Sequence, residues 1–143
     1  LDMTRVTESI DVAVNHVQLF GLFNDLETIP RMLGFVESVQ PTGSDTATWT
    51  VAFANQRRSF NARRTRLEDG HLVRWDSIDQ GQPFFIEVSA TPTGDERSVV
   101  KVDAEFNAGG MAEKLGLAKP IASKALKDEL AHAKSYAERR FIR

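Results

Sequence analysis

The spacing of apolar residues changes near Gly109, and this change constrains the fold more than any other feature of the sequence. Before it, short segments alternate apolar and polar side chains, which is the period of half-buried β-strands. After it, apolar residues recur every three or four positions, as on one side of a helix. This stripe consists of Leu115, Ala118, Ala122, Leu126, Leu130, Ala133, Ala137 and Phe141. The pattern predicts an α+β domain that ends in a long helix.

Seven segments have the strand pattern. They cover residues 6–14, 35–39, 48–54, 58–67, 72–77, 84–91 and 98–106. Turn sequences such as Asp69-Gly70 connect the later segments over short distances, and Asp-Gly is a strong hairpin signal. Because strands joined by short turns pair antiparallel, we expect the later strands to form a meander.

Two short helical segments are expected between the first two strands. Asn15 is suited to cap the first helix, because its side chain can accept a backbone N–H of the first turn. The inward side chains predicted for this helix are Val17, Phe20 and Phe23. A second helical piece is expected at about residues 26–33, with a break near Glu27, because Pro30 fits only in the first turn of a helix.

Pro120 interrupts the C-terminal stripe. The residue before a proline avoids the α region, which predicts a short helix to about residue 117 and a long one from Lys119 or Pro120. About twenty residues at 1.5 Å each make a rod of roughly 30 Å, long enough to cross a sheet. The alanines of the stripe allow close approach to the sheet and leave volume where the sheet curves away. A solid core and a cavity are both compatible with this pattern.

Size, charge and composition exclude several classes of protein. The length of 143 residues suits one domain, which we expect to span residues 3–143. We expect Met3 to be the natural start and Leu1 and Asp2 to be residues added before it. The net charge of −2 gives no general attraction to nucleic acid, and no apolar run reaches the roughly 20 residues of a membrane span. The chain has no cysteine, which excludes zinc–thiolate sites and fits a cytoplasmic location. Its three histidines lack metal-ligand spacing, so we expect no metal and no cofactor.

A set of residues from about Val6 to Glu138 carries a family resemblance. It comprises Glu8-Ser9-Ile10-Asp11-Val12, the segment 17–30 with Phe23, Asp25 and Pro30, Val36-Glu37-Ser38-Val39, Trp49, Trp75, and Leu126-Lys127-Asp128-Glu129-Leu130 with Lys134 and Glu138. These positions resemble the polyketide cyclase/dehydrase group of the START-like (SRPBCC, Bet v 1-like) superfamily. The resemblance implies the helix-grip fold, in which a seven-stranded curved antiparallel sheet, with two short helices after strand 1, wraps a long C-terminal helix.

The same resemblance implies a cavity between the sheet and the long helix. Members of the superfamily accept sterols, lipids, quinones, plant hormones or polyketides in such a cavity. Some resemble aromatase/cyclases, which fold a poly-β-ketone chain and promote its closure and dehydration, and others resemble plain carriers.

Polar residues on the predicted apolar faces are the candidates for chemistry. Glu8 shares a face with Val6 and Ile10. It is either a cavity carboxylate, able to act as a base or to accept a hydrogen bond from a ligand, or a solvated group near the open end of its strand. The sequence leaves both interpretations open.

Two arginines are the other catalytic candidates. By strict alternation Arg64 and Arg66 follow Phe60 on the inward face, where an arginine could bind an enolate, a carboxylate or a quinone carbonyl. A single β-bulge between Ala62 and Leu67 would reverse the face and turn Leu67 inward instead. The arginines could equally belong to a solvated sheet face.

The predicted ligand site is the apolar lining of the sheet and the helix. It comprises Trp49, Val51, Phe53, Phe60, Trp75, Phe84, Ile86, Val88, Val102, Phe106, Leu115, Ala118, Ala122 and Leu126. The indole N–H groups of Trp49 and Trp75 need partners if they are buried, and a pocket wall supplies these more easily than a packed core. A plain core role for both tryptophans stays open.

Three functions follow as hypotheses. The first is binding of a hydrophobic small molecule, such as a lipid, a quinone or a polyketide-like compound, between the sheet and the C-terminal helix. The second is a polyketide cyclase/dehydratase, in which Arg64 or Arg66 steadies enolate charge and a carboxylate such as Glu8, or a water, moves protons. The third is an interaction module that docks the basic strand at residues 57–66 on an acidic protein, and a homodimer is also open. The arginines of this strand are Arg57, Arg58, Arg63, Arg64 and Arg66.

Overall fold

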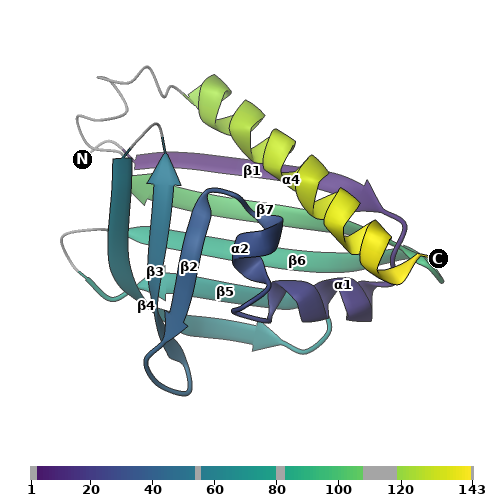
Figure 1. Ribbon diagram of the computed structural model, residues 1–143, viewed down its shortest axis with the longest axis horizontal. Helices are drawn as coiled ribbons and strands as arrows, with labels where there is room; N and C mark the ends of the chain where they lie inside the picture. The colour runs from purple at the N-terminus through teal and green to yellow at the C-terminus, as the bar shows by residue number, and fades with distance from the viewer. Residues whose placement is uncertain (1–2, 54–55, 80–82, 108–118, 143) are drawn as a thin grey trace.

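One antiparallel sheet curls around the C-terminal helix (Figure 1). The structure is a computed structural model that describes residues 3–53, 56–79, 83–107 and 119–142. Its elements are β1 (Met3–Val12), α1 (His16–Phe23), α2 (Ile29–Met32), β2 (Val36–Pro41), β3 (Thr46–Phe53), β4 (Gln56–Glu68), β5 (Leu72–Ser77), β6 (Phe84–Gly94), β7 (Arg97–Asn107) and α4 (Lys119–Phe141). The strand order is β1-β7-β6-β5-β4-β3-β2, so the predicted meander is confirmed and β1 closes beside β7. The helix-grip α+β fold is confirmed as well.

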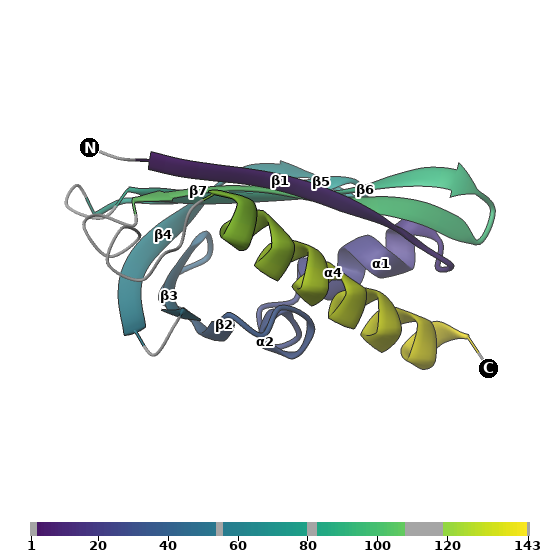
Figure 2. The same ribbon diagram turned by 90° about the horizontal axis from the view of Figure 1, so that it is seen from above.

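The sheet is bent so strongly that it faces α4 from two sides. β1, β7, β6 and β5 form one layer, and β4 curves away from it to carry β3 and β2 to the other side of α4 (Figure 2). The register shifts between Arg64 and Arg66 in β4 and between Val36 and Ser38 in β2. Such irregularities bend a strand and increase its twist, which helps the sheet close around the helix.

The concave face of the sheet and α4 bury one apolar core. Every second residue of a strand points to the same face, so alternating apolar residues cover the concave side. In α4, Leu126, Leu130, Ala133 and Ala137 are buried, and Ala122 and Phe141 are partly buried against the same core. The predicted stripe is thereby confirmed from Ala122 onward. Leu115 and Ala118, like the short helix expected to about residue 117, lie outside the described residues.

The two short helices differ in part from the prediction. The Asn15 side chain accepts the Gln18 N–H at 2.9 Å and caps α1, as predicted. The inward position of Val17 is wrong, because this side chain is 59% exposed. The buried residues of α1 are Leu19, Phe20, Leu22 and Phe23, and at 100° per residue the centre of this face lies well away from Val17. α2 is shorter than the expected piece, with Pro30 in its first turn as predicted.

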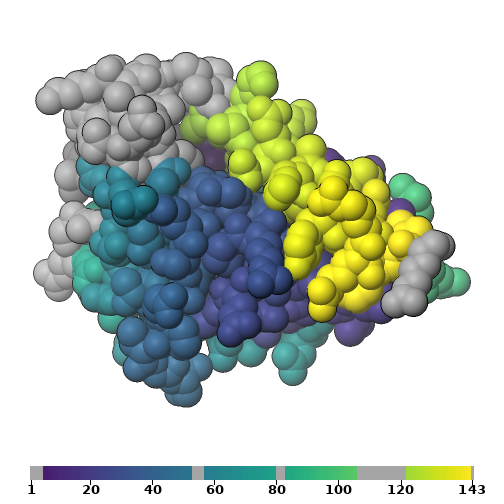
Figure 3. Space-filling model, in the orientation of Figure 1, coloured from purple at the N-terminus to yellow at the C-terminus, as the bar shows by residue number. Residues whose placement is uncertain are grey.

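Polar contacts fix the middle of α4 to the connection between α2 and β2. The Glu129 carboxylate accepts the N–H of Gly34, and His132 Nε2 lies 3.1 Å from the carbonyl oxygen of Arg31. A Cβ atom at position 34 would lie 3.0 Å from the Glu129 carboxylate, so glycine is the residue that admits this close approach. Figure 3 shows α4 against the blue surface that this segment forms.

Two further contacts fix the C-terminal part of α4 to the connection between β1 and α1. Lys134 Nζ donates to the carbonyl oxygen of Asp11 at 2.8 Å, and the Glu138 carboxylate accepts the N–H of Ala13 at 2.9 Å. Lys134 and Glu138 also form an ion pair one turn apart, at 3.1 Å. The helix is therefore positioned by defined hydrogen bonds as well as by apolar packing.

Leu130→Ala is expected to lower the free energy of unfolding by about 2–5 kcal/mol, because it leaves a cavity at a fully buried position of the stripe. Urea unfolding followed by circular dichroism measures the change. Lys127→Ala, on the exposed side of the same helix, is the control and should change the value by less than about 0.5 kcal/mol. Equal effects of the two substitutions would contradict the assigned inward face.

Glu138→Gln is expected to make the stability less sensitive to acid. The hydrogen bond from the Ala13 N–H lowers the pKa of Glu138 below its usual value of 4.5, with a further contribution from Lys134. The stability that this carboxylate contributes is therefore fully present above about pH 5 and is lost as the pH falls through the folded-state pKa. Gln still accepts the Ala13 N–H but does not titrate. The stability difference between the two proteins in urea unfolding should thus be larger at neutral pH than at about pH 4, and a pH-independent difference would contradict this role.

Candidate functional site

Four aromatic rings meet on the concave face of the sheet. The Trp49 ring centroid lies 5.8 Å from that of Trp75 and 6.1 Å from that of Phe84. The Phe60 and Phe84 centroids are 4.3 Å apart. Trp49, Phe60 and Trp75 are buried, and Phe84 is partly buried against them. We call these four residues the aromatic cluster.

The bend of the sheet is what brings the cluster together. Its rings come from β3, β4, β5 and β6, and β4 separates β3 from β5 just as β5 separates β4 from β6. In a flat sheet, strands two apart are roughly 9.5 Å from each other. The rings of Phe60 and Phe84 approach to less than half of that distance. The sheet therefore curls tightly at this point, and aromatic side chains fill the inside of the curl.

Most of the predicted ligand-binding residues lie in this one interior. Val51, Ile86, Val88, Val102 and Leu126 are buried in the same core as the aromatic cluster, and Ala122 is packed against it. Phe53 and Phe106 belong to β3 and β7, but their side chains lie outside the described part of the chain, as do Leu115 and Ala118 entirely. Four alanines outside the predicted site are buried in the same interior: Ala47, Ala62, Ala90 and Ala104. Their regular alternation with polar neighbours in the strands is the sequence signal that could have identified them.

Trp49 has a buried polar atom without a partner. Trp49 is 1% exposed, and no group among the described residues accepts a hydrogen bond from its indole N–H. Buried polar groups are nearly always hydrogen-bonded, so such an atom calls for an explanation. Asn24 Oδ1, at the end of α1, is the other buried side-chain polar atom in this state within the described ranges.

Arg64 lies beside the aromatic cluster. Its backbone pairs with that of Trp75, and its guanidinium carbon lies 5.9 Å from the centroid of the Trp75 ring. The side chain is only partly exposed. A cation at this distance over an indole ring is stabilised by the negative face of the ring. The expected inward position is thus observed for Arg64.

The inward position expected of Arg66 is wrong. The β-bulge between Arg64 and Arg66 inserts an extra residue and reverses the alternation of β4. Arg66 consequently lies on the convex face, where it forms ion pairs with Glu68 at 2.6 Å and with Glu87 at 3.5 Å. The alternative prediction was a bulge that turns Leu67 inward. The bulge is present and Leu67 pairs with the buried Val73, but the Leu67 side chain is itself 41% exposed.

Glu8 lies on the concave side near the sheet edge formed by β1. It pairs with Val102 in the β1–β7 ladder and is partly exposed. Neither a cavity role nor a solvated role is decided by this position. Both remain predictions.

Other arginines of the basic strand have acidic partners. Arg57 forms two hydrogen bonds with the Glu37 carboxylate, which lower the pKa of Glu37, and Arg63 lies 3.7 Å from Asp45. These pairs are exposed on the protein surface. They offset part of the positive charge that a docking function would use, and the docking hypothesis stays untested.

The convex face carries a group of ion pairs and cation–ring contacts. Arg5 donates two hydrogen bonds to Asp103 and Thr7 donates a third, and together they lower the pKa of Asp103 against the opposing effect of its burial. Arg74 lies 4.0 Å from the ring centroid of Phe85 on the same side. These groups stabilise the sheet from outside and do not reach the aromatic cluster.

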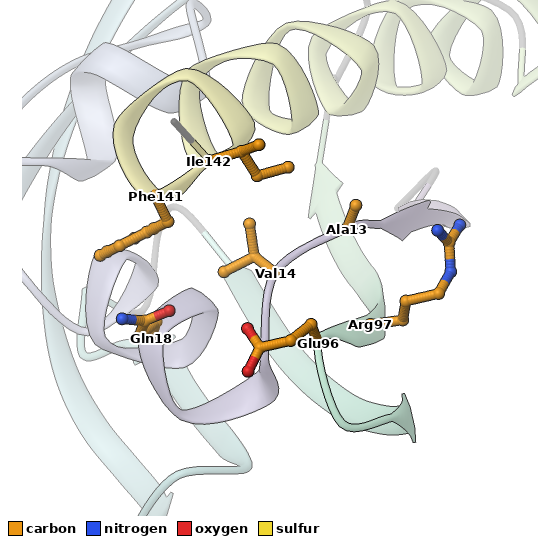
Figure 4. Close-up of a pocket in the computed structure, with 7 residues that line it drawn as sticks. All are labelled: Ala13, Val14, Gln18, Glu96, Arg97, Phe141 and Ile142. Carbon is orange, nitrogen blue, oxygen red and sulfur yellow. The ribbon is translucent and has the colours of Figure 1, made fainter.

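A hollow lies at the C-terminal end of α4 (Figure 4). It has a volume of about 480 Å³ and is lined by Ala13, Val14, Gln18, Glu96, Arg97, Phe141 and Ile142. Three segments far apart in the sequence form it, which is why alternation and helical spacing did not predict it. It is open to solvent, and it is lined by residues outside the predicted site.

Two classes of feature are missing from the described ranges. Among these residues, no group of three or more His, Asp or Glu side chains is placed to hold a metal ion. Nor does any helix in them combine the length and the apolar character needed to cross a membrane.

Comparison with known proteins assigns the family. The family model described as polyketide cyclase/dehydrase and lipid transport matches residues 3–138. The chain belongs to this family. This chain is also similar to an uncharacterized 17.2 kDa protein of Streptomyces lincolnensis, 22% identical over 138 residues, which are 96% of this chain and 92% of that protein.

Solved structures agree with the START-like fold of the polyketide cyclase/dehydrase family. A START superfamily protein from Mycobacterium smegmatis superposes with a TM-score of 0.76 at 13% identity, covering 94% of this chain and 97% of that one. The Zhui aromatase/cyclase of a Streptomyces species gives a TM-score of 0.75 at 17% identity, covering 97% and 96%. Norcoclaurine synthase from Thalictrum flavum gives 0.67 at 13% identity, covering 99% and 96%. At these identities the likeness concerns the fold.

Proposed function

We propose that this protein binds a hydrophobic, ring-containing small molecule between the concave face of the sheet and α4. The observation that carries the proposal is the aromatic cluster, with Arg64 beside it and the N–H of Trp49 unpartnered within it. A purely structural core has no need of an unpaired donor among its rings. Quinones and polyketide-like compounds combine flat rings with oxygen acceptors and suit these walls.

Burial supplies the binding energy in this proposal. Removing apolar surface from water is worth roughly 25 cal/mol per Å², from which the cost of immobilising the ligand is subtracted. Aromatic rings add offset or edge-to-face contacts with a planar ligand. The alanines of the sheet and Ala122 of α4 present small side chains to this interior, and in this proposal a planar ring system lies against them.

Ala122→Trp is expected to abolish binding of the neutral probe N-phenylnaphthylamine, because the indole fills the space between α4 and the sheet. Probe fluorescence measures binding, and circular dichroism shows that the variant is folded. Ala131→Trp is the matched control, since Ala131 lies on the exposed side of the same helix and should leave binding unchanged. Unaltered binding to a folded Ala122→Trp protein would rule out this location.

A cyclase/dehydratase is the second candidate, and the position of Arg64 favours it. A guanidinium held beside aromatic walls can stabilise the enolate that develops when a poly-β-ketone closes on itself. The walls would hold the chain in a folded, reactive conformation, which contributes through proximity. Glu8 is the acid–base candidate on the same side of the sheet.

Arg64→Met is expected to separate the two functions. In a cyclase it lowers turnover of a synthetic poly-β-ketone thioester by about 100-fold, because it removes a group that stabilises the transition state, and changes affinity much less. Product formation is followed by liquid chromatography with mass spectrometry. Arg66→Met, on the convex face, is the control and should change neither quantity. Parallel losses of turnover and affinity in Arg64→Met would indicate a carrier instead.

A further inference from the structure

The indole N–H of Trp49 is a buried hydrogen-bond donor for which the described residues provide no acceptor. The ring lies between Val39 and Phe60 on the neighbouring strands, and it contacts Trp75 and Phe84. None of these side chains carries an oxygen acceptor. Bulk solvent does not reach the indole either, since Trp49 is 1% exposed.

The backbone does not resolve this mismatch. Trp49 lies in the middle of β3, which pairs with β2 on one side and with β4 on the other. Carbonyl groups of a central strand are engaged in the ladder and lie in the plane of the sheet, while the indole stands out from it. The indole therefore lies on the concave side of the sheet, where a bound molecule would lie.

We infer that Trp49 selects the ligand by donating its indole N–H to an acceptor oxygen on the ring system, such as the carbonyl of an aromatic ketone or a quinone. This inference rests on the proposed function and narrows it, because a purely hydrocarbon ring or lipid tail leaves the donor unmatched. A site built around a hydrogen bond discriminates strongly against an analogue that lacks the partner group, since a buried polar group is then left unpaired.

A pair of probes with the same shape tests the inference. Acetylnaphthalene and isopropenylnaphthalene, substituted at the same ring position, differ only in a carbonyl oxygen replaced by a methylene group. The ketone is better solvated by water, so a pocket without a donor binds the alkene more tightly. With the Trp49 bond, the wild-type protein is expected to favour the ketone by roughly 5- to 100-fold in isothermal titration calorimetry.

Two further measurements assign the preference to Trp49. Trp49→Phe keeps an aromatic ring and removes the N–H, so the preference for the ketone should disappear or reverse while the alkene still binds. Arg66→Met, on the convex face and outside the aromatic cluster, is the control and should retain the preference. In ¹H–¹⁵N spectra of the wild-type protein, the Trp49 indole proton should shift downfield with the ketone and not with the alkene, a readout that does not depend on any variant being stable.

The outcomes separate this inference from the function beneath it. Binding of both probes with equal affinity, or tighter binding of the alkene, without a ketone-specific indole shift overturns the inference and leaves the proposed function standing, with an internal water as the partner of Trp49. Binding of neither probe overturns the proposed function and the inference together. Ketone preference that survives in Trp49→Phe assigns the donor to another residue and also overturns the inference.

Discussion

The close packing of α4 in the curl of the sheet is the constraint on which the rest of the structure depends. Small residues of the helix, such as Ala133 and Ala137, are fully buried and let the rod approach β1. Apolar packing alone is tolerant of sliding, because Leu and Ala positions recur along the stripe. Glu129 and Glu138 remove this freedom, since each accepts one particular backbone N–H. The helix is thereby held from its middle to its C-terminal end, and the interior beside Ala122 and Leu126 has a defined wall.

Sequence periodicity predicted the architecture well because every strand of this fold contributes residues to the core. A strand with one buried face must alternate, so all seven strands were found, and β5 was found at its observed bounds. The ends of other strands were missed where both faces are exposed, as in β6 beyond residue 91, because no apolar signal marks them there. In α1, the spacing of apolar residues wrongly predicted that Val17 is buried, whereas the buried face is formed by four larger residues further along the helix. The anchors of α4 left no local pattern, since their partners are backbone atoms 95 and 125 residues away.

A single inserted residue decides which arginine reaches the interior. Alternation placed Arg64 and Arg66 together, and the bulge separates them: one lies over Trp75, the other pairs with acids on the convex face. A bulge is a property of the pairing between two strands. The sequences of β4 and β5, each taken separately, give no sign that their pairing is interrupted between Arg64 and Arg66. The apolar part of the candidate site could therefore be predicted from the sequence, while its charged part required the register of the sheet.

The polar groups beside the aromatic cluster share one property that narrows the chemistry of a ligand. The Arg64 guanidinium and the Trp49 indole can only donate hydrogen bonds. A ligand that satisfies both must present hydrogen-bond acceptors, such as carbonyl oxygens, on a flat, mostly apolar frame, and a protonated amine or a plain hydrocarbon does not. Because the fold itself accommodates many unrelated ligands, this donor character carries more information than the shape of the curl. It favours ketone-rich ring compounds in the binding and the cyclase interpretation alike, since a carbonyl that accepts these bonds in the ground state becomes the enolate oxygen during ring closure.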